Sequence, residues 1–397
     1  MTRLLILTAG FGEGHNTAAR AIAAACEAEH GPGSARIVDA FALTAPRLNA
    51  LSRRGYIEAI NRTPKLWSAF YAWLDRSRIV PQMRWLLRAE MELLARIVAE
   101  EKPTVVCSTY PVYAFIFEKL IRDGRVTVPH YNVVTDSISI NSLWWRAGSE
   151  GWFVPNDDSR DVMLEAGLDP ARLHVTGFPV TSFFSRHARE FTPPDLARGA
   201  QPRVLYIVHS GTKHAEETAR RLLAMPDWDI TCAVGRDDAL RGKLTALAAG
   251  RARPALILGW TDQIPKLLMT HHAIVSKAGG ATTQESIASR CPMIVNQVVP
   301  GQEEGNYELL RRHGVGALAE TPDAVMAALQ RAFADRGRVW SQWRAALDTI
   351  ARPDAARDIV AHLLPPAPRH SASPLPAPAS PALAAASTRS FAPEVTA

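Results

Sequence analysis

Apolar residues in the first part of the chain occur in short runs, and most of these runs precede a segment with helical spacing. Each run has the length of a buried parallel strand. Because strands alternate with helical segments, this pattern predicts one doubly wound α/β domain over residues 1–190. The predicted strands are 4–8, 35–39, 104–109, 130–136, 152–155 and 173–179.

The same pattern restarts after residue 203 and predicts a second domain over 203–350. Residues 186–202 lack periodicity and contain three prolines, so we interpret them as the linker between the two domains. Two doubly wound domains that face each other enclose a cleft. In this domain we predict strands 203–208, 229–234, 255–258, 272–276 and 292–296, and helices 214–224, 238–248, 263–270, 322–334 and 338–350.

The end of the chain differs from both domains. Residues 351–364 have helical spacing and predict a C-terminal helix. Residues 365–397 are rich in proline, alanine and serine, and we expect this tail to be disordered.

Composition agrees with a folded globular chain of two domains, since 47% of the 397 residues are hydrophobic and 21% are charged. No apolar run reaches the length of a membrane span, and the chain enters the run 3–7 without a signal-peptide pattern. The four cysteines are far apart and form no C-x-x-C pair. We therefore expect a cytoplasmic protein with buried thiols.

Residues 51–89 hold eight Arg or Lys and two acidic residues, a surplus equal to the net charge of +6 of the whole chain. Tryptophan and tyrosine are interleaved with these basic residues. This composition is typical of a surface that binds an anionic membrane, or of a solvated helical face above core tryptophans. No nucleic-acid motif accompanies the charge, so nucleic acid is not an expected partner. The candidate membrane residues here are Arg53, Arg54, Trp67, Trp73 and Trp85.

A glycine-rich turn, residues 9–15, follows the first predicted strand and leads into an alanine-rich helix. Its spacing differs from the dinucleotide fingerprint G-x-G-x-x-G. The turn ends at His15, where a helix N-terminus disfavours the protonated imidazole, so this residue is a candidate general base. The alternative is a histidine that only caps the turn.

Residues 276–285 join a buried strand to a helix through Gly279 and Gly280. Backbone N–H groups at a helix start, next to glycines that allow close approach, form a seat for a phosphate or pyrophosphate. An ordinary turn is the alternative, in which Thr282 caps the helix and Glu285 closes a capping box.

Six motifs taken together resemble the GT-B glycosyltransferases grouped with monogalactosyldiacylglycerol synthase and the processive diacylglycerol glucosyltransferases. The chain is more distantly similar to the peptidoglycan N-acetylglucosamine transferase. The resemblance extends over residues 4–364 and implies the GT-B fold, in which two Rossmann-like domains face a cleft. The motifs, in the family's order, are 12–15, 134–136, 177–179, 259–260, 276–285 and 300–306.

This resemblance implies a UDP-galactose or UDP-glucose donor bound by the C-terminal domain. Gly279, Gly280, Ala281 and Thr282 would hold the pyrophosphate, and Glu285 would accept hydrogen bonds from the ribose hydroxyls. The other implied donor residues are Trp260 and Thr261 beside uracil, Gln302, Glu303 and Asn306 facing the sugar, Ser210, Gly211 and Thr212 near the phosphates, and Gly14 and Lys277.

The resemblance also implies inversion at the anomeric carbon by in-line displacement, with His15 as the base. Asp136 is the alternative base, or it orients His15. The family implies no metal and no cofactor, because helix N-termini and side-chain donors stabilise the leaving pyrophosphate. We interpret the one D-x-D sequence, Asp227-Trp-Asp229, as a turn before a strand.

The chain departs from the family at Glu13, where a carboxylate close to His15 would raise its pKa. It also has Asn141-Ser142 in place of the His-Pro of the galactolipid synthases, just before Trp144 and Trp145, which we expect near the acceptor.

The leading hypothesis is a hexosyltransferase that glycosylates diacylglycerol on the inner face of the cell membrane. The alternatives are a GT-B enzyme with a non-lipid acceptor, an enzyme like the UDP-GlcNAc epimerases, and a non-catalytic module that binds nucleotide sugars.

Overall fold

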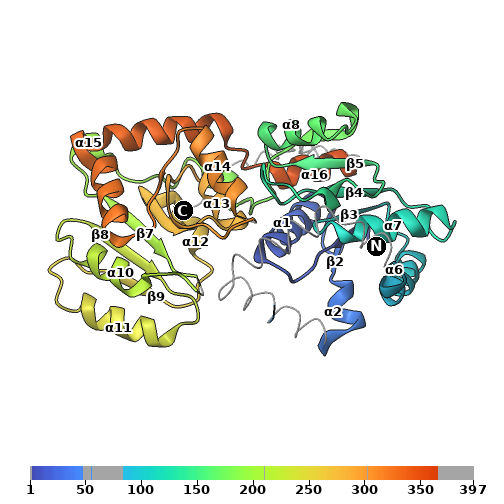
Figure 1. The fold of residues 1–397 in the computed structure, drawn as a ribbon, viewed down its shortest axis with the longest axis horizontal. Coiled ribbons are helices and arrows are strands. Elements are labelled where there is room, and N and C mark those ends of the chain that lie inside the picture. The colour runs from blue at the N-terminus through green and yellow to red at the C-terminus, as the bar shows by residue number, and fades with distance from the viewer. Residues whose placement is uncertain (1, 48–54, 56–83, 210, 302, 365–397) are drawn as a thin grey trace, which may run out of the picture. The chain divides into compact units, whose positions relative to one another are not determined.

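Residues 2–47, 55, 84–209, 211–301 and 303–364 are described by the structure, which is a computed structural model. Residues Met1–Pro365 form one compact unit (Figure 1). The predicted disordered tail and most of the basic-aromatic segment 51–89 lie outside the described residues. The boundaries that we predicted between the two domains remain predictions, because Met1–Pro365 is not divided further.

The N-terminal half is built on a six-stranded parallel sheet with the strand order β2-β1-β3-β4-β5-β6. The strands are β1 (Leu4–Leu7), β2 (Ala35–Val38), β3 (Val105–Ser108), β4 (His130–Val133), β5 (Gly151–Val154) and β6 (Leu173–Val175). The helices are α1 (Glu13–His30), α2 (Ala40–Thr44), α6 (Arg88–Glu101), α7 (Val112–Arg122), α8 (Asp157–Glu165) and α9 (Phe183–Arg186), with short 3₁₀ turns η1 (Arg84–Leu87), η2 (Ser142–Trp144), η3 (Pro170–Arg172) and η4 (Leu196–Arg198).

The C-terminal half repeats this architecture with a second parallel sheet in the order β12-β11-β10-β7-β8-β9. Its strands are β7 (Arg203–Ile207), β8 (Asp229–Ala233), β9 (Leu256–Leu258), β10 (Ala273–Lys277), β11 (Met293–Gln297) and β12 (Ala317–Leu318). Its helices are α10 (Ala215–Leu223), α11 (Asp238–Ala248), α12 (Ile264–Thr270), α13 (Gly280–Ala288), α14 (Glu304–Arg312) and α15 (Pro322–Ile350). The predicted pair of doubly wound sheets is confirmed.

Each sheet has one point where the strand order reverses, between β1 and β3 in the first and between β7 and β10 in the second. In open α/β sheets, ligands bind outside the carboxyl ends of the strands at this switch point. The loops that follow these four strands therefore define where a site is expected.

The predicted break between helices 322–334 and 338–350 is confirmed. The span of α15 contains non-helical residues at Ala334–Gly337, so it consists of two helical segments. Gly337 has φ 78°, and a side chain there would lie 2.6 Å from Leu196, a buried residue of the predicted linker. The linker thus packs on the C-terminal half.

The last helix, α16 (Ala355–Leu363), returns to the N-terminal half and packs on α1 (Figure 1). Its Ile359 and Val360 are buried in the same hydrophobic cluster as Leu4 of β1 and Ile22 of α1. The helix predicted at 351–364 therefore completes the core of the first sheet, and not that of the half that precedes it in the chain.

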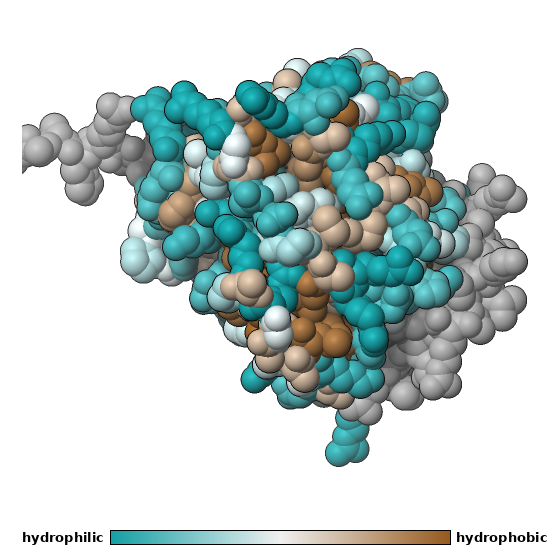
Figure 2. All heavy atoms as spheres, turned by 90° about the vertical axis from the view of Figure 1, so that its left-hand side faces the viewer, coloured by the Kyte–Doolittle hydropathy of each residue, from teal (hydrophilic) through white to brown (hydrophobic). Residues whose placement is uncertain are grey.

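Polar side chains cover most of the face shown in Figure 2, and apolar residues appear between them in smaller groups. The four cysteines are buried and free, as predicted. Within the described ranges, none of the helices combines the length and the apolar character that crossing a bilayer requires.

Candidate functional site

His15 lies at the start of α1, directly after the β1 loop, at the first switch point. Its Nδ1 is 2.6 Å from the carbonyl oxygen of Thr109, which follows β3, and 2.9 Å from the hydroxyl of Thr135. Because a carbonyl only accepts, Nδ1 carries the proton and Nε2 presents its lone pair. Burial lowers the pKa of His15 to about 4, although the bond to Thr109 works in the opposite direction. His15 is therefore a neutral imidazole at physiological pH.

Glu13 does not raise the pKa of His15. Helix α1 begins at Glu13, and the carboxylate is 3.1 Å from the guanidinium of Arg20, two turns further along the helix. The ring of His15 instead contacts Tyr110 at a centroid distance of 5.2 Å and Trp144 at 6.4 Å. These aromatic neighbours supply the burial that keeps the imidazole neutral.

Asp136 follows β4 and is held by Trp144, whose indole Nε1 donates a 2.7 Å hydrogen bond to Oδ2. Burial raises the pKa of Asp136 to about 6, and this bond partly opposes the rise. The groups that orient His15 are Thr109 and Thr135, while Asp136 is bonded to Trp144. Trp144 is fully buried, and it contacts both His15 and Asp136. Trp145 is half-buried.

Helix α13 starts at the second switch point, where the phosphate seat was predicted. It begins at Gly280, and its N-cap is Gly279, which makes no side-chain capping bond. The capping box of Thr282 and Glu285 is therefore wrong, because both residues lie inside the helix. The first N–H groups of a helix have no intrahelical partner, so those of Gly280, Ala281 and Thr282 are available to a ligand.

The starts of α1 and α13 lie against each other. A Cβ built on Gly14 would be only 3.9 Å from the backbone nitrogen of Ala281. The residue before the candidate base thus contacts the start of the phosphate seat.

Polar side chains of the 299–306 segment support this seat. The Nζ atom of Lys277 lies 2.5 Å from Oε1 of Glu303, and the other carboxylate oxygen accepts the N–H of Val299 at 3.0 Å. The Asn306 amide donates to the Ala278 carbonyl at 2.9 Å, and its buried Oδ1 has no hydrogen-bond partner among the described residues. Asn306 therefore offers an acceptor to a ligand hydroxyl, whereas the Glu303 carboxylate is already engaged.

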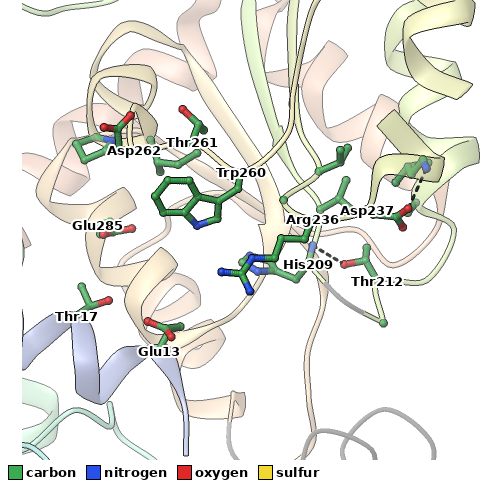
Figure 3. A pocket seen from close by; sticks show the side chains of 18 of the residues that line it. Glu13, Thr17, His209, Thr212, Arg236, Asp237, Trp260, Thr261, Asp262 and Glu285 are labelled. Carbon is green, nitrogen blue, oxygen red and sulfur yellow. Dashed lines mark hydrogen bonds between the residues drawn. The ribbon is translucent and has the colours of Figure 1, made fainter. Parts of the chain in front are cut away.

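A cavity of about 1590 Å³ lies beside α13 (Figure 3). Trp260, which is 72% exposed, stands in it across from Glu285. Burial raises the pKa of Glu285 to about 7, and Arg20 lowers it. The predicted donor residues that line the cavity are Gly211, Thr212, Trp260, Thr261 and Glu285.

His209 is a cavity residue that sequence reasoning missed, although it precedes the predicted 210–212 loop directly. It follows β7, and its Nε2 lies 3.1 Å from the hydroxyl of Ser276 at the end of β10. Its backbone N–H donates to the hydroxyl of Thr212 at 3.1 Å. Burial, and then the charge of Lys277, lower its pKa to about 4.

Further cavity residues were also missed. Arg236 follows Gly235 at the carboxyl end of β8, a position that the predicted strand already marked. Helix α1 of the other half contributes one face of the cavity wall, at helical i, i+4 and i+7 spacing. The missed residues include His209, Arg236, Asp237, Asp262, Glu13, Thr17 and Arg20.

Several predicted residues cannot be placed. Arg53, Arg54, Trp67, Trp73, Ser210 and Gln302 lie outside the described residues. Of Trp85, only its position in η1 is described.

No metal site is evident in the described part of the chain, where no group of three or more His, Cys, Asp or Glu side chains is placed to hold an ion. Asp229 of the D-x-D sequence opens β8 and forms ion pairs with Arg203 and Arg253. That no metal or cofactor takes part remains a prediction.

The fold is that of the GT-B glycosyltransferases. It matches *Acinetobacter baumannii* MurG with a TM-score of 0.58 at 13% identity, covering 91% of this chain and 99% of that one. Os79 of *O. sativa*, in complex with U2F and trichothecene, matches with a TM-score of 0.59 at 12% identity, covering 91% and 100%. The *S. aureus* MnaA–UDP complex matches at 0.56 and 13%, covering 91% and 96%.

Within this class, the chain resembles the monogalactosyldiacylglycerol synthase and processive diacylglycerol glucosyltransferase family, as predicted. The family described as monogalactosyldiacylglycerol (MGDG) synthase matches residues 15–180. The processive diacylglycerol beta-glucosyltransferase of *Bacillus cytotoxicus* is 25% identical over 364 residues, covering 90% of this chain and 92% of the relative. That of *Bacillus cereus* (strain AH187) is 25% identical over 368 residues, covering 91% and 93%.

Proposed function

We propose that this chain is an inverting hexosyltransferase that transfers a hexose from UDP-glucose or UDP-galactose to the hydroxyl of diacylglycerol. The observation that carries this proposal is the contact between two helix starts. One bears a neutral histidine with a bare Nε2, and the other bears the N–H groups of a phosphate seat. The relatives named as processive diacylglycerol beta-glucosyltransferases support the same reaction along nearly the whole chain.

In this reaction, Nε2 of His15 takes the proton of the acceptor hydroxyl as its oxygen attacks the anomeric carbon. The bond from that carbon to the β-phosphate oxygen breaks on the opposite face, and UDP leaves with the bonding electron pair. Negative charge therefore develops on the diphosphate, where the N-terminal N–H groups of α13 stabilise it. The configuration at the anomeric carbon is inverted.

The donor's other parts match the remaining side chains. Glu285 accepts hydrogen bonds from the two ribose hydroxyls, and Trp260 offers its exposed indole to uracil. The unpartnered Oδ1 of Asn306 accepts from a hydroxyl of the hexose. Arg236 adds a positive charge to the cavity lining, which suits a negatively charged donor. Neither a metal nor a cofactor is part of this proposal.

Diacylglycerol resides in a membrane, so the enzyme must work at a membrane surface. The basic and aromatic composition of residues 51–89 supports peripheral binding to an anionic lipid face. We expect this face to be the inner one of the cell membrane.

The test is a product assay with diacylglycerol vesicles and separately labelled UDP-glucose and UDP-galactose. We expect label in the lipid phase with one of the two donors, as a glycosyldiacylglycerol of inverted configuration. If no label enters the lipid and the protein instead epimerises UDP-GlcNAc, the proposed acceptor and reaction are both wrong. Co-sedimentation with anionic and neutral vesicles tests the membrane partner separately.

A further inference from the structure

The loop that follows Asp136 in the N-terminal half contacts two helices of the C-terminal half. We propose that Gly305 and Gln284 form a docking seat for this loop, residues 137–139, and that sugar transfer occurs in the docked arrangement. Both are positioning residues, since neither is assigned a contact with the reacting atoms. The inference rests on the proposed function and adds a requirement to it.

Gly305 lies in the first turn of α14, and the loop occupies the space that any side chain there would need. A Cβ built on Gly305 would overlap the carbonyl oxygen of Ser137 and lie 2.5 Å from the backbone nitrogen of Ser139. Glycine is a poor helix former, so at this position it weakens α14. What it permits is direct contact between the backbones of the loop and the helix.

Gln284 supplies a specific hydrogen bond at the same interface. Its Nε2 donates to the hydroxyl of Ser137 at 2.9 Å, and both side chains are buried. The loop itself is strained, because Ile138 is β-branched and has φ 57°. The backbone N–H of Ile138 donates a hydrogen bond to the Ser159 hydroxyl at 3.1 Å.

The docked segment also reaches the base. The hydroxyl of Thr135 contacts Nδ1 of His15 at 2.9 Å, while a Cβ on Gly280 would lie 3.7 Å from the Thr135 carbonyl oxygen. One short segment thus contacts the candidate base on one side and the phosphate seat on the other. Docking of the 137–139 loop therefore sets the distance between His15 and the donor.

Helix α14 is tied to the N-terminal half at its other end as well. Asp158 of α8 accepts hydrogen bonds from Arg312 at 3.0 Å and His313 at 2.9 Å. Burial opposes the charge of Asp158, but these two bonds outweigh it and lower its pKa. Both ends of α14 are thus fixed, and its first turn carries Asn306.

The test compares Gly305→Ala with Gly242→Ala. Both add one methyl group to a helix, but at Gly242, in α11, nothing lies within 4 Å of the new Cβ. For Gly305→Ala we expect kcat to fall by about tenfold or more, since small misplacements of reacting groups are costly. UDP affinity by calorimetry should stay within about twofold, because the residues proposed to bind UDP, such as Trp260 and Glu285, lie in the C-terminal half. The Tm should fall by no more than about 2 °C, because the better helix propensity of alanine offsets part of the loop contacts that are lost. Gly242→Ala should raise the Tm by about 1–2 °C and leave kcat unchanged.

Gln284→Ala and Ser137→Ala test the hydrogen bond. Each should lower kcat by about threefold to tenfold, and the double variant should lose no more than either single one, because they remove the same bond. A kcat for Gly305→Ala within twofold of wild type would overturn the inference. So would a parallel loss of Tm and UDP affinity, which would make Gly305 a merely structural residue.

Small-angle scattering with saturating UDP separates this inference from the proposed function. We expect a larger radius of gyration for Gly305→Ala than for wild type and Gly242→Ala, and equal radii would contradict docking. If the wild type binds UDP but transfers no sugar to diacylglycerol, the proposed function fails while the scattering comparison still tests the docking seat.

Discussion

The two switch points of this protein each hold a half-buried histidine, and the hydrogen bonds of the two differ. His15 follows β1, and His209 follows β7, the corresponding first strand of the second sheet. Burial lowers both pKa values to about 4, so both rings are neutral at physiological pH. At His15 the Nδ1 atom is bonded to a carbonyl and Nε2 is left for a substrate proton. At His209 the Nε2 atom is already bonded to Ser276.

Residue type and burial therefore do not by themselves decide whether a histidine can act as a base. The partner of one ring nitrogen decides which tautomer is present and whether the other nitrogen can act as a base. On this argument we propose His15 as the base, and His209 as a residue that positions the loop bordering the cavity.

Each switch point also has a carboxyl group whose pKa is raised by burial. The pKa is about 6 for Asp136, near His15, and about 7 for Glu285, near the phosphate seat. The two halves therefore contribute different pH dependences, the first to the chemical step and the second to donor binding.

The largest expected effect is that of His15→Ala. It should lower kcat by about 10²- to 10⁴-fold, because it removes the general base, while UDP affinity stays near that of wild type. Steady-state kinetics together with calorimetry of UDP binding measure both. Activity within tenfold of wild type would assign the base elsewhere, with Asp136 the first candidate.

Glu285→Gln should weaken UDP binding by about tenfold to 100-fold at pH 8, since a carboxylate accepts stronger hydrogen bonds than an amide. In wild type, UDP affinity should fall as pH drops below about 7, because the carboxyl group becomes protonated there. The variant should show no such change. Calorimetry of UDP binding from pH 5.5 to 8.5 distinguishes wild type from the variant. Equal UDP affinities of the two proteins at pH 8 would show that Glu285 does not bind the ribose.

The same variant should also change how the free energy of unfolding depends on pH. The folded-state pKa of Glu285 lies above its usual value of 4.5, so its stabilising contribution is complete below about pH 4.5 and is lost as pH rises through 7. Relative to wild type, Glu285→Gln should therefore gain about 2 kcal/mol between pH 5 and pH 8. Denaturant unfolding at these two pH values measures this, and a constant difference would contradict the assigned pKa.

The smallest expected effect is that of His209→Ala. It removes one neutral hydrogen bond, to Ser276, and should raise the KM for the donor by about fivefold with little change in kcat. A fall in kcat as large as that of His15→Ala would contradict the different roles proposed for His15 and His209.

The positions of the strands could be predicted from the sequence, and these positions marked most of the site. Short apolar runs are a local signal, and the residues after them lie at the carboxyl ends of parallel strands. His15 and Gly280 were predicted in this way, whereas Trp260 was predicted from the family resemblance. Helix starts were less accurate, since α1 already begins at Glu13, inside the turn predicted at 9–15. Strand β12, only Ala317–Leu318, was too short for its pattern to be recognised.

Contacts between distant segments could not be predicted. The partner of His15, Thr109, is 94 residues away, and the Ser137–Gln284 bond spans 147 residues. The cavity wall formed by α1 was missed because the sequence shows which residues share a face of that helix but not what the face meets. The same holds for Trp144, whose bond to Asp136 depends on how the 136–144 loop folds back.

The return of α16 to the first sheet bears on how the chain folds during synthesis. Ile359 and Val360 pack with Leu4 and Ile22, so the strand and helix that flank His15 share a core with the last described helix. On a ribosome, the N-terminal residues emerge first, but the partners that cover them emerge only after almost all the other described residues. The half that carries His15 therefore completes its core only after residue 364 has emerged. Until residue 364 is released, part of its apolar surface stays open to chaperones or to aggregation.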